Sequence, residues 1–231
     1  MFNLTLLKFW SVCVMTNKKH SFSYKIENCV GSANLGTSLN LKELYKYLIR
    51  LQSELQSELR DKGEGDDILI GGEYPFLVRH QPREFPGLIL KLRFQVRASL
   101  LVFSSGNIVI TGAKNKEELD KVAKIVVELF NRCGFKIKEV PRIKLQNIVA
   151  SADLGKSINL ELVASIMGEN AYYEPEIFPG LIFKMDQPKV VLLLFRSGKV
   201  VCTGAKSEKM IEEALERIDQ ILEEIDAYTE E

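Results

Sequence analysis

Short runs rich in apolar residues form a set that occurs twice along the chain. The runs cover residues 24–30, 86–94, 98–104 and 107–112, and then 143–150, 179–186, 190–196 and 199–204. Apolar runs of this length, bounded by turn signals, are typical of β-strands. Ser105 with Gly106, and Ser197 with Gly198, stand between the last two runs of each set and indicate turns. The pattern predicts an antiparallel meander in each half of the chain.

Apolar residues at helical spacing follow each meander. They are Leu119, Val122, Ala123, Val126 and Phe130, and then Ile211, Ala214, Leu215, Ile218 and Leu222. One apolar stripe per helix predicts two closing helices, each packed with a single face on the sheet. A further helix is expected to open at Ser38 in the first half and at Ser157 in the second. These helices would cover only one sheet face, so the other face must meet something else.

Three sequence blocks occur twice in the same order. IENCVGSANLGTSLNL (26–41) resembles LQNIVASADLGKSINL (145–160), FPGLI (85–89) returns at 178–182, and SLLVFSSGNIVITGAK (99–114) resembles VLLLFRSGKVVCTGAK (191–206). Shared order over three blocks indicates a tandem duplication. We place the boundary near Val140 and Pro141, which gives a first repeat over 22–140 and a second over 141–231.

Strand alternation also predicts which side chains lie on the uncovered sheet face. They are Asn28, Val30, Leu101, Phe103, Val109 and Thr111, with Asn147, Val149, Leu193, Phe195, Val201 and Thr203 from the second half. No charged residue is among them. For any single Val or Leu, a plain core position is the alternative interpretation.

Charge is unevenly distributed although the formal net charge is zero. Residues 207–231 hold ten acidic and two basic side chains, so the rest of the chain carries an excess of eight positive charges. A basic body with an acidic tail is compatible with a nucleic-acid partner, which the total alone would argue against.

Residues for metal or catalytic chemistry are sparse. The cysteines lie far apart, without a Cys-x-x-Cys pair, at Cys13, Cys29, Cys133 and Cys202. His20 and His80 have no metal-binding partners near them in sequence, and no Ser/His/Asp set or phosphate-binding loop occurs. We therefore expect no metal, no cofactor, no catalysis and a reducing, intracellular location.

The opening residues are apolar but do not read as a signal peptide or a membrane span. Lys8 interrupts the apolar run, no positive segment precedes it, and it is too short to cross a bilayer. We expect residues 1–21 to form a disordered extension, with Met15 as an alternative start, and no membrane contact.

The paired blocks resemble those of the TATA-box-binding protein family, from about Ser23 to Leu222. The resemblance implies an α+β saddle of two tandem pseudo-symmetric repeats, a curved antiparallel sheet of about ten strands with helices on its convex face. It also implies a general transcription factor whose concave face binds the minor groove of TATA-containing double-stranded DNA. The family is itself an established example of minor-groove kinking.

The same resemblance assigns roles by position. Phe85 with Phe103, and Phe178 with Phe195, match the two pairs that wedge between base steps. Asn28 and Asn147 match central amides that bind base acceptors, with Thr111 and Thr203 beside them. The apolar floor corresponds to Val30, Leu101, Val109, Val149, Leu193 and Val201. Candidate phosphate contacts are Arg83, Lys91, Lys114, Lys184, Lys199 and Lys206.

A loop of the second repeat matches the family's contact for a transcription factor B-type protein, through which RNA polymerase is recruited. The matching residues are Glu174, Glu176 and Ile177. Two carboxylates around a proline-stiffened turn suit a basic partner surface.

Two departures separate the repeats. Asn107 stands where the second repeat has Lys199, and Glu84 precedes Phe85, so we expect the first repeat to bind DNA more weakly. In addition, 57 residues separate Asn28 from Phe85, against 31 between Asn147 and Phe178. The excess predicts an inserted helix at about 49–74. Leucines at heptad-like spacing run from the preceding helix into this insert and form one seam. They are Leu41, Leu44, Leu48, Leu51, Leu55 and Leu59.

The inserted helix has two interpretations, packing on its own repeat or binding a partner, including a second copy of the chain. The function also has alternatives. A divergent paralogue could keep the fold as a protein-binding or non-catalytic nucleic-acid platform, and an unrelated α+β enzyme could share the sheet.

Overall fold

A single ten-stranded antiparallel sheet organises the computed structural model, which describes residues 22–61, 75–93 and 96–229. The expected extension over 1–21 and the part of the inserted segment at 62–74 lie outside the described residues. The strands are β1 (Tyr24–Asn34), β2 (Phe76–His80), β3 (Leu88–Leu92), β4 (Ala98–Val102), β5 (Asn107–Ala113), β6 (Lys144–Asp153), β8 (Ala171–Tyr172), β9 (Leu181–Met185), β10 (Val190–Leu194) and β11 (Lys199–Ala205).

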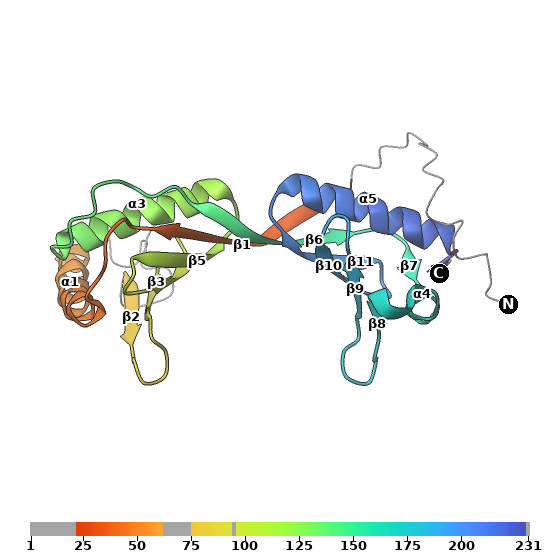
Figure 1. The fold of residues 1–231 in the computed structure, drawn as a ribbon, viewed down its shortest axis with the longest axis horizontal. Coiled ribbons are helices and arrows are strands. Elements are labelled where there is room, and N and C mark those ends of the chain that lie inside the picture. Colours follow the sequence, from red (N-terminus) through yellow and green to blue (C-terminus); the bar gives the residue numbers. More distant parts are fainter. Residues whose placement is uncertain (1–21, 62–74, 94–95, 230–231) are drawn as a thin grey trace.

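The strand order makes the duplication visible in space. It runs β2-β3-β4-β5-β1-β6-β11-β10-β9-β8, so each half repeats the other outward from the central β1–β6 pair. Cys29 lies opposite Ile148 at the centre, with Val30 opposite Asn147 and Asn28 opposite Val149. Figure 1 shows the resulting arch, with the β2–β3 and β8–β9 loops hanging below its two ends. The α+β saddle expected from the sequence is the observed fold.

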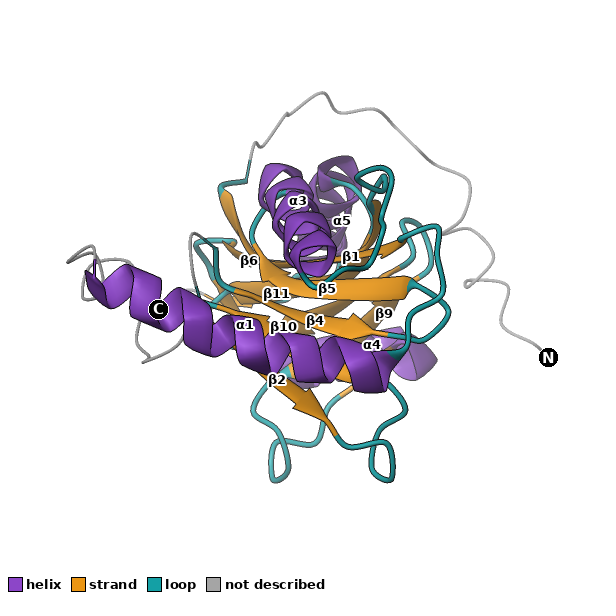
Figure 2. Cartoon of the chain, turned by 90° about the vertical axis from the view of Figure 1, so that its left-hand side faces the viewer, coloured by secondary structure: helices purple, strands orange, loops and turns teal. Residues whose placement is uncertain are grey.

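The helices in the described part of the chain cover one side of this sheet. They are α1 (Leu41–Asp61), α3 (Lys116–Arg132), α4 (Leu160–Met167), the 3-10 turn η2 (Gly168–Asn170) and α5 (Glu208–Glu224). α3 and α5 lie over the central strands, whereas α1 lies along the β2 flank and contacts β2 (Figures 1 and 2). Every residue of the two predicted closing-helix stripes is buried. Burial of these stripes supplies much of the hydrophobic stabilisation.

The predicted helix starts at Ser38 and Ser157 are wrong by three residues. Helix α1 begins at Leu41 and α4 at Leu160, because asparagine side chains cap both. Asn40 Oδ1 accepts the backbone N–H of Glu43 at 3.2 Å, and Asn159 Oδ1 that of Leu162 at 3.0 Å. Ser157–Ile158 instead form strand β7, which pairs with β12 (Tyr228–Thr229) near the end of the chain.

The edge strands β2 and β8 have no counterpart among the runs predicted from the sequence. β2 pairs with β3 over its whole length, and β8 joins β9 through two residues only. Strand β8 has only two residues, too few to show a periodicity in the sequence. Strand β2 is short, and its apolar residues are followed by Arg79 and His80.

Helix α1 packs on its own repeat along the part of the leucine seam whose side chains are described. Leu44, Leu48 and Leu51 are buried, and Leu55 is partly buried against the core. Buried Gln52 donates its side-chain N–H to the backbone carbonyl of Phe76 in β2. The side chain of Leu59 lies outside the described ones. These contacts support packing on the same repeat.

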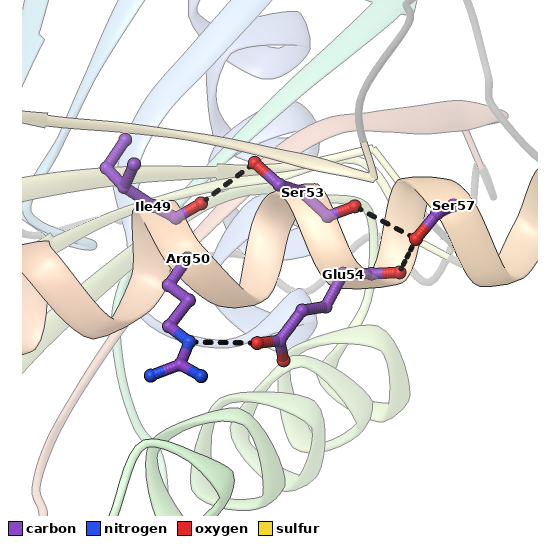
Figure 3. A network of polar contacts seen from close by, with 5 residues as sticks. All are labelled: Ile49, Arg50, Ser53, Glu54 and Ser57. Atoms are coloured by element: carbon purple, nitrogen blue, oxygen red, sulfur yellow. Dashed lines mark hydrogen bonds and ion pairs between the residues drawn. The ribbon is translucent and has the colours of Figure 1, made fainter.

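The outward face of α1 satisfies its polar groups locally, as Figure 3 shows. Arg50 Nε lies 3.0 Å from Glu54 Oε1, one turn further along the helix. Ser57 Oγ donates to the backbone carbonyl of Glu54 at 2.9 Å. A side-chain ion pair at i and i+4, such as Arg50 with Glu54, stabilises an exposed helix by about 0.2–0.5 kcal/mol. No helix among the described residues is long and apolar enough to cross a membrane.

Candidate nucleic-acid interface

The sheet face opposite the helices is only partly covered, as strand alternation predicts. On β4, Leu100 and Val102 are buried while Leu101 remains half-exposed between them. On β5, Val109 and Thr111 are half-exposed on either side of buried Ile110. The second repeat shows the same burial pattern on β10 and β11. We call the half-exposed side the open face.

Rows of apolar side chains cross the open face. In the first repeat, Ile89 lies opposite Leu101, and Leu101 opposite Val109. The equivalent row of the second repeat is Ile182, Leu193 and Val201. Sequence reasoning missed the two isoleucines, although alternation from Lys91 and Lys184 would have placed them on this face.

Asparagines at the centre of the open face are fixed by main-chain bulges. Beyond Cys29 the β1–β5 register shifts, and the N–H of Gly112 donates to Asn28 Oδ1 at 2.8 Å. Gly112 has φ of 99°, a backbone conformation that suits glycine. Asn28 Nδ2 then donates to Thr111 Oγ1 at 3.2 Å. Asn28 Nδ2 carries two N–H groups and Thr111 accepts one of them, so the other remains for an acceptor outside the protein.

The second repeat builds the same arrangement around Asn147. Gly204, with φ of 94°, donates its backbone N–H to Asn147 Oδ1 at 2.7 Å. Asn147 Nδ2 lies 3.4 Å from Thr203 Oγ1. The predicted Asn and Thr pairs are therefore brought together in both repeats, and Asn28 and Asn147 lie on the adjacent central strands β1 and β6.

An aromatic pair stands at the outer end of each repeat. The ring centroids of Phe85 and Phe103 are 5.8 Å apart, and those of Phe178 and Phe195 are 5.9 Å apart, both edge to face. All four rings are only partly buried. Such pairs add about 0.5–1.5 kcal/mol beyond their area burial, so the rings hold one another while part of each stays accessible.

The glycine of each Phe-Pro-Gly block makes room for its phenylalanine ring. A Cβ on Gly180 would lie 2.8 Å from a ring carbon of Phe178 and 3.0 Å from one of Phe195. A Cβ on Gly87 would lie 2.5 Å from a ring carbon of Phe85. The sequence therefore repeats Phe-Pro-Gly because any larger residue after the proline would displace the ring.

All six candidate phosphate-binding side chains are exposed, and none forms an ion pair with a described residue; they are Arg83, Lys91, Lys114, Lys184, Lys199 and Lys206.

The two repeats differ at the position of Lys199. Lys199 lies opposite Asp153, whereas Asn107 lies opposite Asn34 and accepts its amide N–H at 2.7 Å.

One carboxylate reaches the open face, so the prediction of a face without charge is wrong at this point. Glu27 Oε1 accepts a hydrogen bond from Ser151 Oγ at 2.8 Å. This bond, together with Lys25, lowers the pKa of the Glu27 carboxyl and keeps it ionised. At the matching position, Gln146 donates to Ser32 Oγ at 2.6 Å. Alternation missed Glu27 because the β1 register shifts between Ile26 and Asn28.

The loop before β9 presents an apolar side chain beside two carboxylates. Ile177 is 78% exposed, and Glu174 and Glu176 are exposed with it. The N–H groups of Ile177 and Phe178 both donate to the backbone carbonyl of Glu174, which closes the turn. A hydrogen bond to Glu174 raises the pKa of the neighbouring Tyr172 hydroxyl.

No metal centre can be assembled from the described residues. They contain no group of three or more His, Cys, Asp or Glu side chains placed to hold an ion. Cys133 and Cys202 are buried free thiols, and burial raises the pKa of each to about 11. Thiols in this state are poor nucleophiles and poor ligands.

Comparisons with known proteins converge on one family. The family model described as transcription factor TFIID, or TATA-binding protein, matches residues 73–133 and 142–225. The TATA-box-binding protein of Pyrobaculum calidifontis is 41% identical over 210 residues, covering 90% of this chain and 91% of the relative. That of Methanothermobacter thermautotrophicus is 41% identical over 202 residues, covering 87% and 96%.

A solved structure agrees with these sequence relatives. The Methanococcus jannaschii TBP superposes with a TM-score of 0.70 at 38% sequence identity. The match covers 87% of this chain and 99% of that one.

Proposed function

Because the chain belongs to the TATA-box-binding protein family, whose members are non-catalytic DNA-binding general transcription factors, we propose that its open face binds the minor groove of A·T-rich promoter DNA. The observation that carries the proposal is the pair of Asn–Gly–Thr arrangements at the centre of the sheet. In each, the asparagine carbonyl accepts a backbone N–H, and one of the two amide N–H groups is bonded to threonine, which leaves the other for an acceptor on DNA.

The chemistry of this face fits the minor groove better than the major groove. A·T and T·A pairs present only acceptors there, and a G·C pair adds the guanine N2 amine, a donor. Amide N–H groups suit the acceptors. A guanine amine would meet apolar rows such as Ile89, Leu101 and Val109, which offer it no acceptor. The face therefore selects A·T-rich DNA without distinguishing A·T from T·A.

The second element of the proposal is bending of the DNA by the aromatic pairs. In this account Phe85 with Phe103, and Phe178 with Phe195, enter base steps at the two ends of the site and kink the duplex. Steps such as TA unstack most easily, so kinking adds selectivity at positions that no side chain reads. On binding, DNA bases rather than protein cover the part of each ring that is exposed to water.

Recruitment of partners is the third element of the proposal. The exposed Ile177, flanked by Glu174 and Glu176, offers a small apolar contact inside an acidic patch. A transcription factor B-type protein with a basic surface around an apolar pocket would fit it, and RNA polymerase would follow through that protein. These partners, and the DNA, place the chain inside the cell with the genome.

A gel-shift comparison tests the DNA-binding proposal. The full chain should retard a TATA-containing duplex and, at the same concentration, leave a G·C-substituted duplex free. Equal retardation of both duplexes would contradict the proposal. It would favour the divergent paralogue, a family member that uses the same fold as a platform for other partners.

A further inference from the structure

The carboxylate of Glu27 lies at the inner end of an apolar row of the open face. Its Oε1 accepts a hydrogen bond from Ser151 Oγ at 2.8 Å, and Ser151 lies opposite Val201 of the second repeat's row. The next residue along β1 is Asn28, one of the two central asparagines. Glu27 therefore stands among the side chains that face base edges in the proposed complex, inside the rim along which the phosphates pass.

One oxygen of this carboxylate is free to accept a further hydrogen bond. Lys25 Nζ lies 3.2 Å from Glu27 Oε1, the same oxygen that Ser151 uses, and Oε2 has no partner among the described residues. Lys25 and Ser151 also line a hollow together with Val201 and Phe195. The side chain of Glu27 is 39% exposed, so a donor that enters from the open face can reach Oε2.

The base pairs present one kind of donor to such an oxygen. In the minor groove, A·T and T·A pairs show only acceptors, and the guanine N2 amine of a G·C pair is the added donor. An ionised carboxylate accepts hydrogen bonds but donates none. Glu27 therefore opposes the acceptors of an A·T pair and matches the amine of a G·C pair, and a charged acceptor makes that hydrogen bond a strong one.

The matching position at the first repeat's row holds a neutral amide. Gln146 Nε2 donates to Ser32 Oγ at 2.6 Å, and Ser32 lies opposite Val109 of that row. The second N–H of Gln146 can donate to an acceptor and its carbonyl can accept from a donor, so this amide suits either kind of base pair. The inner ends of the two rows therefore differ in what they ask of the DNA.

We propose that Glu27 accepts the N2 amine of a guanine in the minor groove, so that a G·C pair is less unfavourable beneath the second repeat's row than at the symmetric position. The inference rests on the proposed function and adds a specificity-determining residue to it. It also gives the pseudo-symmetric face a direction. A G·C pair away from the centre of the element lies beneath Glu27 in one orientation of the protein and beneath Gln146 in the other.

The test uses fluorescence anisotropy with the full chain and a fluorescein-labelled, self-complementary duplex of alternating T and A. Exchanging one adenine for 2,6-diaminopurine adds the N2 amine to the minor groove and keeps the major-groove pattern of A·T. The first amine is moved pair by pair away from the centre. The second amine is then added at the symmetric pair, which the first orientation places beneath Gln146.

For the parent, the first amine should lower affinity at least about fivefold less than the second amine does, at the pair that meets Glu27. Glu27→Gln should make the two amines equally costly and should not weaken binding to the unmodified duplex. Gln146→Glu should give both rows a carboxylate, and the second amine should then cost no more than the first.

Asp153→Asn is the matched control for the loss of charge. Asp153 is exposed two residues beyond Ser151 on β6, and its Oδ1 accepts the N–H of Gly155 at 2.9 Å, which an asparagine carbonyl also does. The variant removes the same charge as Glu27→Gln and should keep the parental difference between the two amines.

The outcomes separate this inference from the proposed function. If the parent binds the unmodified duplex but loses equal affinity to the first and second amines at every pair, Glu27 does not accept the amine and the proposed function stands. A parental difference that persists in folded Glu27→Gln would overturn the inference in the same way. If the parent does not bind the unmodified duplex, both the inference and the proposed function are wrong.

Discussion

The side-chain carbonyl of Asn28 accepts a 2.8 Å hydrogen bond from the backbone N–H of Gly112, across a bulge between β1 and β5. Asn147 and Gly204 repeat the relationship at 2.7 Å. In both cases the main chain fixes which end of the amide faces outward. The centre of the open face is therefore a pair of oriented donors, held before any ligand arrives.

The first prediction follows from this orientation. In Asn28→Asp the carboxylate still accepts the N–H of Gly112, so the fold and melting temperature should be kept. The outward donor is lost and a negative charge replaces it. Affinity for a TATA duplex, measured by fluorescence anisotropy, should fall by about 1.5–3 kcal/mol, or roughly ten- to a hundredfold.

Asn40→Asp is the matched control for that variant. Asn40 caps helix α1 by accepting the N–H of Glu43, a role that aspartate fills equally well. It adds the same charge at an exposed position outside the residues assigned to DNA binding. Equal losses of affinity in the two variants would show that net charge, and not the amide donor, is responsible.

The second prediction concerns the aromatic pairs. Phe178→Ala or Phe195→Ala should leave the sheet folded, because both rings are only partly buried. Unstacking a base step costs a few kcal/mol, and without the ring nothing offsets that cost. Energy transfer between dyes at the two duplex ends should report a smaller bend.

The control for these variants is a core substitution on the same sheet. Leu192 is fully buried beneath the open face, and Leu192→Ala should cost about 2–5 kcal/mol of unfolding free energy. Phenylalanine variants that remain folded and bend the duplex as the parent does would overturn the assignment of the rings.

Much of the fold could be predicted from the sequence because each pattern occurs in both repeats. The strands of the two meanders and the closing-helix stripes were predicted near their observed positions. What could not be predicted depends on neighbours that are distant in sequence. Ser157 is a strand residue because Tyr228 and Thr229 come back beside it, and Ile158 pairs with Tyr228 there.

The candidate site likewise has features that the sequence predicts and features that depend on residues distant in sequence. Alternation predicts that Leu101, Val109 and Thr111 share a face, and the structure places all three there. The position of Glu27 could not be predicted in this way, because it depends on a register shift in β1.

The third prediction concerns the acidic loop of the second repeat. Glu174→Arg with Glu176→Arg reverses the charge around Ile177, and should abolish recruitment of a transcription factor B-type protein to preformed complexes with DNA. TATA affinity should not decrease, because Glu174 and Glu176 are exposed in the β8–β9 loop, outside the residues assigned to the open face, and the change removes negative charge there. A supershift assay measures both quantities. Unchanged recruitment would mean that the loop is only a solvated turn.

The fourth prediction concerns the long helix of the first repeat. Gln52→Ala would leave the backbone carbonyl of Phe76 without its donor in a buried place, at a cost of about 1–3 kcal/mol of unfolding free energy. TATA affinity should be unchanged because α1 lies away from the open face. Ser53→Ala, at an exposed position one residue along, should change neither quantity. A Gln52→Ala protein as stable as the parent would argue against packing of α1 on β2.

The most direct test of minor-groove binding compares three duplexes that differ only in the base pairs of the TATA element. Replacing A·T by inosine·cytosine changes the major groove but adds no N2 amine to the minor groove, whereas G·C adds that amine. The account predicts nearly equal affinity for the A·T and inosine·cytosine duplexes. It predicts a loss of about 1–3 kcal/mol for each G·C pair. Binding that follows the major-groove pattern, with the inosine duplex as weak as the G·C duplex, would contradict it.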